Sequence, residues 1–173
     1  MHRFGFVKVG ACVPELKVED VKFNTEEIKK QIEGAIEKNV GVLVFPELCL
    51  TGYTCADLFQ QEVLLQKCEE AIEDLLAFSK NKNIVFIAGT PIFCDNALFN
   101  SAIVIQNGKI LGIIPKTYIP NYNEFYEKRW FASSEHLVSK EIHLFHQNIP
   151  IGVDLLFTCE NRKGFTFGDK RDL

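Results

Sequence analysis

Three short runs in the first half of the chain predict strands: Phe4–Cys12, Gly41–Phe45 and Ile84–Ala88. The last two are apolar enough to indicate buried strands. Two longer segments separate these runs and carry apolar residues at the three- and four-residue spacing of a helix face. The first helix is predicted to begin with Asn24 as its N-cap, and Glu27, three residues on, completes a capping box. The second helix is predicted over roughly Glu62–Lys80.

A β-hairpin is predicted next. Ala97–Gln106 and Lys109–Pro115 flank Asn107-Gly108, and these two residue types readily adopt the positive φ angles of a tight hairpin turn. Two β-α-β units followed by a hairpin predict an α/β fold, in which a mixed sheet carries its helices on one face. Two further strands are expected within Gly152–Cys159 and Gly164–Gly168.

Composition excludes several classes of protein. The 173 residues carry a net charge of −4 without a long basic run, so we expect no nucleic-acid surface. No apolar run is long enough for a signal peptide or a membrane span. The six cysteines form no Cys-x-x-Cys pair, which favours free thiols and a cytoplasmic protein. His136, His143 and His146 lack the carboxylate motif that would indicate a metal site.

The first candidate for chemistry is a carboxylate at the end of a predicted strand. Pro46 ends the run Gly41–Phe45, so Glu47 is expected just past the carboxyl end of that strand. Open α/β sheets form their ligand-binding crevices at such ends. A carboxylate placed there against apolar walls suits a general base. The alternative is an edge residue that faces solvent.

The second candidate is a lysine that ends the hairpin. Lys116 is followed by a loop rich in aromatic residues and carboxylates, Glu124 among them. A buried lysine beside carboxylates remains protonated and can stabilise an oxyanion. The alternative is an exposed ion pair between Lys116 and Glu124 that contributes less than ~1 kcal/mol.

Both candidates lie in motifs that resemble a known family. Phe45-Pro-Glu47-Leu-x-x-Thr-Gly-Tyr53 and Lys116-Thr-Tyr-x-Pro-Asn-Tyr122-x-Glu124-Phe resemble two signatures of the nitrilase, or carbon–nitrogen hydrolase, superfamily. Thr51-Gly-Tyr-Thr-Cys-Ala-Asp-Leu-Phe59 is similar to the amino-terminal glutaminase domain of glutamine-dependent NAD synthetases. The resemblance implies an α-β-β-α sandwich of the nitrilase type, incomplete at its C-terminus. It assigns residues 1–168 to a partial hydrolase domain and leaves 169–173 as a divergent tail.

The resemblance also implies an activity and a role for each site residue. The family hydrolyses the side-chain amide of glutamine with a Glu-Lys-Cys triad. Glu47 would be the general base, Lys116 would stabilise the tetrahedral intermediate, Glu124 would orient Lys116, and Tyr122 would bind glutamine. No cofactor is expected in this domain. ATP and magnesium are implied for a synthetase domain that would receive the ammonia, and a homo-oligomer is expected.

The nucleophile is where this sequence departs from the family pattern. The resemblance places the catalytic cysteine after Gly168, where this chain instead reads Asp169-Lys-Arg-Asp-Leu173. Cys159 is a weak substitute, and Cys49 and Cys55 are expected to pack within their loop. We therefore expect no glutaminase activity from this polypeptide alone. The alternatives are a free-standing amidase or carbamoylase of the same superfamily, or a shortened, non-catalytic partner subunit.

Overall fold

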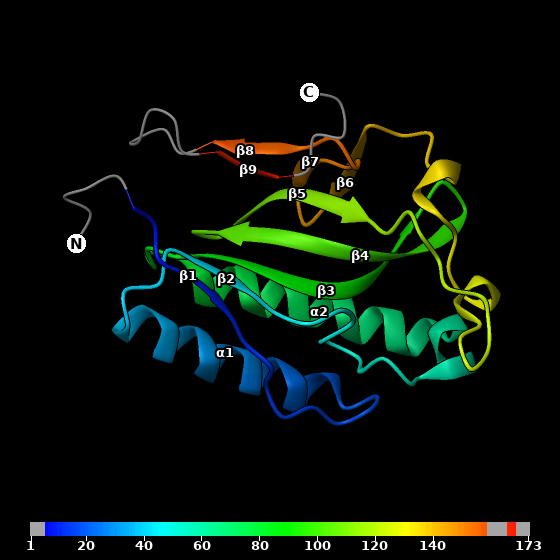
Figure 1. Cartoon of the computed structure of the whole chain (residues 1–173), viewed down its shortest axis with the longest axis horizontal. Helices are drawn as coiled ribbons and strands as arrows, with labels where there is room; N and C mark the ends of the chain where they lie inside the picture. Colours follow the sequence, from blue (N-terminus) through cyan, green and yellow to red (C-terminus); the bar gives the residue numbers. More distant parts are fainter. Residues whose placement is uncertain (1–5, 159–165, 169–173) are drawn as a thin grey trace.

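The computed structural model describes residues 6–158 and 166–168 (Figure 1). Its main sheet has five strands in sequence order: β1 (Val9–Ala11), β2 (Val42–Val44), β3 (Val85–Cys94), β4 (Ala97–Gln106) and β5 (Lys109–Pro115). The pairs β1–β2 and β2–β3 are parallel, whereas β3–β4 and β4–β5 are antiparallel. This confirms the predicted mixed sheet and the α/β class.

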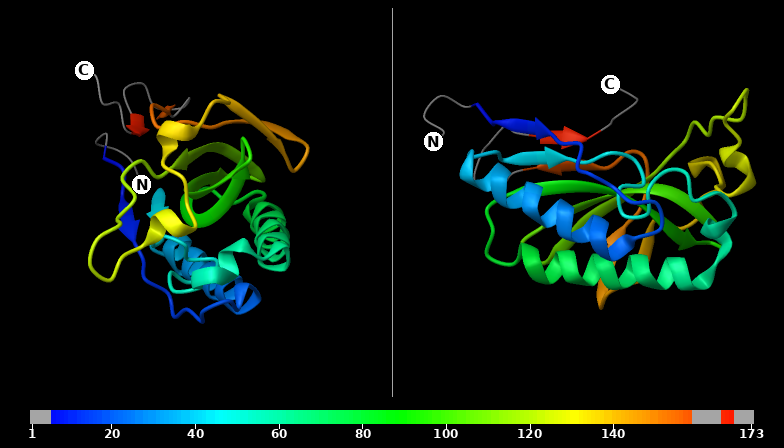
Figure 2. Two further views of the ribbon diagram at one scale, coloured as in Figure 1. Left: turned by 90° about the vertical axis from the view of Figure 1, so that its right-hand side faces the viewer. Right: turned by 90° about the horizontal axis from the view of Figure 1, so that it is seen from below.

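Both long helices cover the same face of this sheet (Figures 1 and 2). They are α1 (Val21–Glu37) and α2 (Glu62–Ser79). Ile28 of α1 and Leu75 of α2 are fully buried, as are Phe86 of β3 and Ile103 of β4 on the sheet. The core therefore lies between the helices and the sheet, as the apolar spacing predicted.

The predicted start of α1 was wrong by one turn. The helix begins at Val21, and its N-cap is Asp20, whose carboxylate accepts a hydrogen bond from the Phe23 amide. Asn24 lies inside the helix and is fully buried. Its side chain accepts from the Lys17 amide and donates to the carbonyls of Lys17 and Leu50. Asn24 therefore ties the helix to two loops, a role that a local capping pattern does not reveal.

The strand predicted over Ile84–Ala88 is longer in the structure. β3 continues to Cys94 because each of its ten residues pairs with a residue of β4. The second predicted hairpin strand, β5, has the bounds expected, and so does β4. Asn107 and Gly108 have φ angles of 47° and 77°, as this tight turn requires.

Shorter elements complete the described chain. A hairpin that the sequence analysis did not predict pairs β6 (Glu141–Leu144) with β7 (Gln147–Pro150). Phe145 and His146 form its turn with positive φ angles, and these residue types give no turn signal. The expected tail strands are confirmed within narrower bounds, as β8 (Leu156–Thr158) pairs with β9 (Thr166–Gly168). The described residues also include three 3₁₀ helices: η1 (Ala56–Gln60), η2 (Glu127–Arg129) and η3 (Ser134–His136). Cys159 and the tail 169–173 lie outside the described residues.

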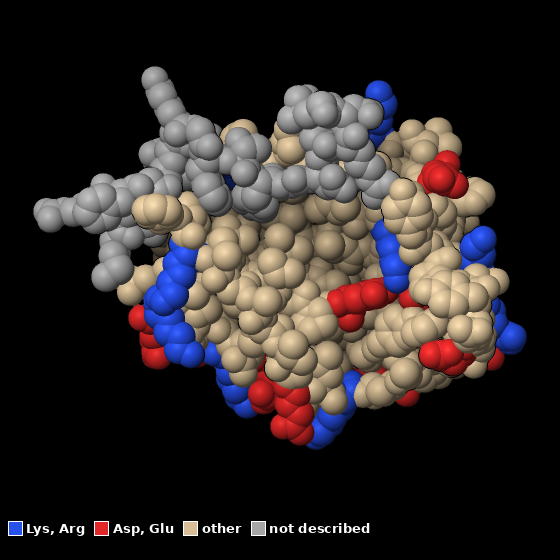
Figure 3. Space-filling model, in the orientation of Figure 1, with Lys and Arg blue, Asp and Glu red and all other residues tan. Residues whose placement is uncertain are grey.

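The sheet face opposite α2 is also largely apolar. Val9 of β1 and Val44 of β2 are 67% and 41% exposed, and Val44 is paired with the partly buried Ile87 of β3. Figure 3 shows this side of the molecule as uncharged and hollowed in its middle, with acidic and basic side chains meeting at one border of the hollow. Within the described ranges, no helix is long and apolar enough to cross a membrane.

Candidate active site

Glu47 lies in a tight turn that follows β2 and rests on β3. The Leu50 amide donates to the Gly89 carbonyl of β3 at 3.2 Å. Gly89 permits this close approach, because a Cβ there would lie 2.3 Å from the Leu48 nitrogen. Leu48 is buried and has a φ of 50°, a conformation that non-glycine residues adopt at a cost. The predicted position of Glu47, just past its strand, is confirmed.

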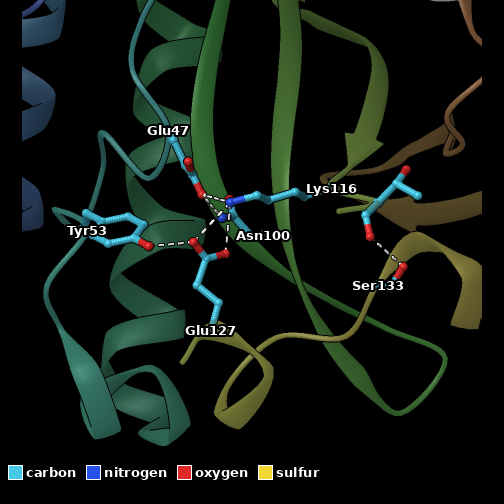
Figure 4. A network of polar contacts seen from close by, with 7 residues as sticks. Glu47, Tyr53, Asn100, Lys116, Glu127 and Ser133 are labelled. Carbon is cyan, nitrogen blue, oxygen red and sulfur yellow. Dashed lines mark hydrogen bonds and ion pairs between the residues drawn. The ribbon is translucent and has the colours of Figure 1, made fainter. Parts of the chain in front are cut away.

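Lys116 reaches Glu47 from the end of β5. Its backbone amide donates to the Asn100 carbonyl at 2.8 Å, and its own carbonyl accepts from Ser134 at 3.0 Å. The Lys116 Nζ lies 2.7 Å from Glu47 Oε1, and the Asn100 side chain donates to the same oxygen. Figure 4 shows these three side chains converging. The expected convergence of Glu47 and Lys116 is confirmed, although the Glu47 side chain remains 40% exposed to solvent.

A second carboxylate at Lys116 belongs to Glu127, at the start of η2. The Lys116 Nζ lies 3.0 Å from Glu127 Oε1 and 2.9 Å from Oε2. The Tyr53 hydroxyl donates to Glu127 Oε1 at 2.6 Å. The Glu127 side chain is only 3% exposed. Packing of Phe131 against Phe59, with ring centroids 4.8 Å apart, fixes the turn that carries it.

Two carboxylates and one ammonium give this cluster a net charge of −1. Partial burial by itself lowers the pKa of Lys116, but its hydrogen bonds and ion pairs with Glu47 and Glu127 outweigh that effect and raise the pKa. Burial, and then the hydrogen bond to Glu127, raise the pKa of the Tyr53 hydroxyl well above its usual value. Lys116 is therefore charged and Tyr53 protonated at neutral pH. Such an ammonium can stabilise a developing oxyanion, and a carboxylate beside it can accept a proton.

Glu124 does not occupy the place predicted for it. The carboxylate that holds Lys116 is Glu127, whereas Glu124 is exposed, and within the described chain it makes no hydrogen bond or ion pair with Lys116. The sequence offered both carboxylates in one loop, three residues apart. Only the burial of the following Trp130 and Phe131 against Phe59 brings Glu127 inward.

Three residues of the cluster were missed or left without a role by the sequence analysis. Asn100 carried no local signal, whereas Glu127 and Tyr53 lay in the segments with family resemblance but were given no role. Tyr122, expected to bind glutamine, is 64% exposed and packs edge-on against Phe125 with centroids 5.9 Å apart. Its role in substrate binding stays a prediction.

The cysteines near the cluster are buried and protonated. Burial raises the pKa of Cys49 to about 12, and its thiol exchanges hydrogen bonds with the backbone of Gly89. Cys55 is also buried, and its thiol donates to the Thr51 carbonyl at 3.1 Å. Both therefore pack within their loop, as expected. In the parts of the chain that the structure describes, no three His, Cys, Asp or Glu side chains are grouped so that they could hold a metal ion.

Comparison with known proteins places these residues in a family context. The family model for carbon–nitrogen hydrolases matches residues 8–157. A glutamine-dependent NAD(+) synthetase from Mycobacterium bovis is 33% identical over 164 residues, and one from Aquifex aeolicus is 36% identical over 140 residues. These matches cover 95% and 81% of this chain but 24% of each relative. The chain thus spans about a quarter of the length of these curated relatives.

Solved structures resemble the fold closely. A glutamine-dependent NAD(+) synthetase from Cytophaga hutchinsonii superposes with a TM-score of 0.81 at 26% identity, covering 90% of this chain and 26% of that one. An amidase from Nesterenkonia sp. superposes with a TM-score of 0.65 at 17% identity, covering 79% of this chain and 50% of that one. The second likeness concerns the fold alone.

Proposed function

Because the chain belongs to the carbon–nitrogen hydrolase family, we propose that Glu47 and Lys116 form the acid–base half of a site that hydrolyses the side-chain amide of glutamine. Glu47 is the general base, and Lys116 stabilises the negative oxygen of the tetrahedral intermediate. Glu127 keeps Lys116 charged and in place. The observation that carries this proposal is the Lys116 ammonium bridging the two carboxylates at 2.7 Å and 2.9 Å.

The proposed chemistry is acyl transfer through a thioester. A thiol gives its proton to Glu47 and attacks the amide carbon, so that a C–S bond forms and the carbonyl oxygen becomes negative beside Lys116. The C–N bond then breaks as the proton passes to the nitrogen, and ammonia leaves. Water hydrolyses the thioester to glutamate and restores the thiol.

The names of the relatives support a proposal for the activity of the whole protein. The names of the relatives are those of glutamine-dependent NAD(+) synthetases, so we propose that the ammonia supplies an NAD synthetase reaction. ATP and magnesium belong to that synthetase reaction, and we assign neither to the Glu47 site. A cytoplasmic location and a homo-oligomer remain part of this proposal.

We propose that this polypeptide alone binds glutamine without hydrolysing it. The described cysteines nearest in sequence to Glu47, Cys49 and Cys55, are buried with raised pKa values, which leaves them poor nucleophiles. The Cys49 thiol pairs with the backbone of Gly89 in β3, and the Cys55 thiol donates to the Thr51 carbonyl of its own loop. Among the described contacts, neither thiol bonds to Glu47 or Lys116.

Two measurements test the proposal. Glutamine is titrated into the ¹⁵N-labelled chain and followed by NMR, with the Glu47→Gln variant as control, and released ammonia is assayed in parallel. We expect saturable shifts at the Lys116 amide without ammonia release. Ammonia released by the wild type and abolished in Glu47→Gln would refute the inactivity of the chain. Binding of acetamide but not glutamine would favour the amidase alternative.

A further inference from the structure

Asn100 of β4 touches both members of the proposed acid–base pair. Its carbonyl accepts the Lys116 backbone amide at 2.8 Å, and its side-chain amide donates to Glu47 Oε1. Asn100 is 3% exposed, so its side chain is held by the strand and by surrounding atoms. A buried donor of this kind directs a carboxylate more rigidly than water does, because its orientation is fixed by the fold.

The two carboxylate oxygens of Glu47 are consequently unequal. Lys116 Nζ and Asn100 Nδ2 both donate to Oε1, and within the described part of the chain no hydrogen bond to Oε2 is found. Glu127 differs, because Lys116 contacts both of its oxygens and Tyr53 adds a third bond. Glu47 is also 40% exposed, whereas Glu127 is 3% exposed. Only Glu47 therefore offers an oxygen that can take up a proton.

We propose that Asn100 is a positioning residue that occupies Oε1 of Glu47 and so makes Oε2 the proton-accepting atom. The proton passes from the attacking thiol to Oε2, which breaks the S–H bond, forms an O–H bond and leaves a thiolate. Lys116 and Asn100 stay on Oε1 throughout, so the carboxylate does not rotate when it accepts the proton. The role of Oε2 as proton acceptor rests on the proposed function. The unequal hydrogen bonding of the two Glu47 oxygens does not.

A change at Asn24 serves as the matched control, because it shows the effect of losing a buried asparagine that has only a structural role. Asn24 is a fully buried asparagine that makes three hydrogen bonds to backbone groups of Lys17 and Leu50. It makes no described contact with Glu47 or Lys116. Replacing either asparagine by leucine removes a buried amide, and both changes are expected to lower stability. Only the change at Asn100 is expected to alter the Glu47 carboxylate.

Infrared spectroscopy reads this carboxylate directly. The separation between its antisymmetric and symmetric stretching bands is wide when donors bind one oxygen and narrows when both oxygens are equivalent. Each protein is compared with the same protein carrying Glu47→Gln, so that the difference spectrum isolates the bands of Glu47. We expect the separation to narrow in Asn100→Leu and to stay as in the wild type in Asn24→Leu. An unchanged separation in Asn100→Leu overturns the proposal.

A second measurement covers the case in which Asn100→Leu does not fold. In the wild type, one side-chain N–H proton of Asn100 is expected downfield and protected from exchange, because it binds a carboxylate. In Glu47→Ala, at a position that is already partly exposed, this proton should move upfield and exchange faster. Identical signals in both proteins overturn the proposal. Neither measurement involves glutamine, so a failure to bind glutamine defeats the proposed function and leaves this test intact.

Discussion

Gly89 lies beneath the backbone of the Glu47 turn, and we predict that Gly89→Ala displaces this turn and destabilises the protein. A Cβ at this position would lie 2.3 Å from the Leu48 nitrogen, 2.7 Å from the Pro46 oxygen and 2.9 Å from the Glu47 carbonyl carbon. All three are backbone atoms, so no side-chain rotation relieves the contact. Either β3 or the turn must move.

The size of the effect follows from these distances. Non-bonded heavy atoms pack best at roughly 3.5 Å, so the Leu48 nitrogen must retreat by about 1 Å. Overpacking of a well-packed core costs about 1–3 kcal/mol, and a purely backbone clash belongs at the upper end of that range. For a chain of this length, about 3 kcal/mol corresponds to a fall in Tm of roughly 6–12 °C.

Urea and thermal unfolding of purified variants measure this effect, with Gly34→Ala as the control. Gly34 lies within α1, and a Cβ there would meet no atom within 4 Å. That change should stabilise the protein by about 0.5–1 kcal/mol, because alanine loses less backbone entropy than glycine in a helix. If Gly89→Ala is as stable as the wild type, the close approach that we describe beneath Glu47 is wrong.

Three further predictions concern the cluster and the titratable groups. Glu127→Gln should lower the free energy of unfolding, measured in urea, by roughly 2–4 kcal/mol, because a buried ion pair loses one partner. Glu124→Gln should change it by less than about 0.5 kcal/mol. Equal effects of the two changes would contradict the finding that Glu127, and not Glu124, holds Lys116. Hydrogen bonds, chiefly from the Ser139 hydroxyl, lower the pKa of Asp95. The stability that they provide is therefore present above about pH 4 and is lost as the pH falls through the lowered pKa. Asp95→Asn should therefore show a shallower loss of stability in acid, and curves of equal slope would rule this out. Burial raises the pKa of Cys49 to about 12, so a thiol reagent at about pH 8 should modify the less buried Cys12 first and Cys49 only after unfolding; simultaneous labelling would show that Cys49 is accessible.

Much of the fold followed from local sequence signals. The Asn107-Gly108 hairpin and α2 were placed almost to the residue, because turn chemistry and apolar periodicity act over a few neighbouring positions. The hairpin turn at Phe145 and His146 was missed. These residues adopt positive φ angles because the pairing of β6 with β7 holds them there, not because of their own preference.

In the candidate site, too, some features follow from the local sequence and others only from tertiary packing. The sequence alone determined that Glu47 follows a buried strand and that Lys116 follows a hairpin strand, and motif resemblance linked the two. Which carboxylate holds Lys116 was decided by tertiary packing, since Phe131 and Phe59 bring Glu127 inward and leave Glu124 in solvent. A buried ionic contact depends on residues far apart in the chain, so its partners are fixed only when the elements that carry them pack together.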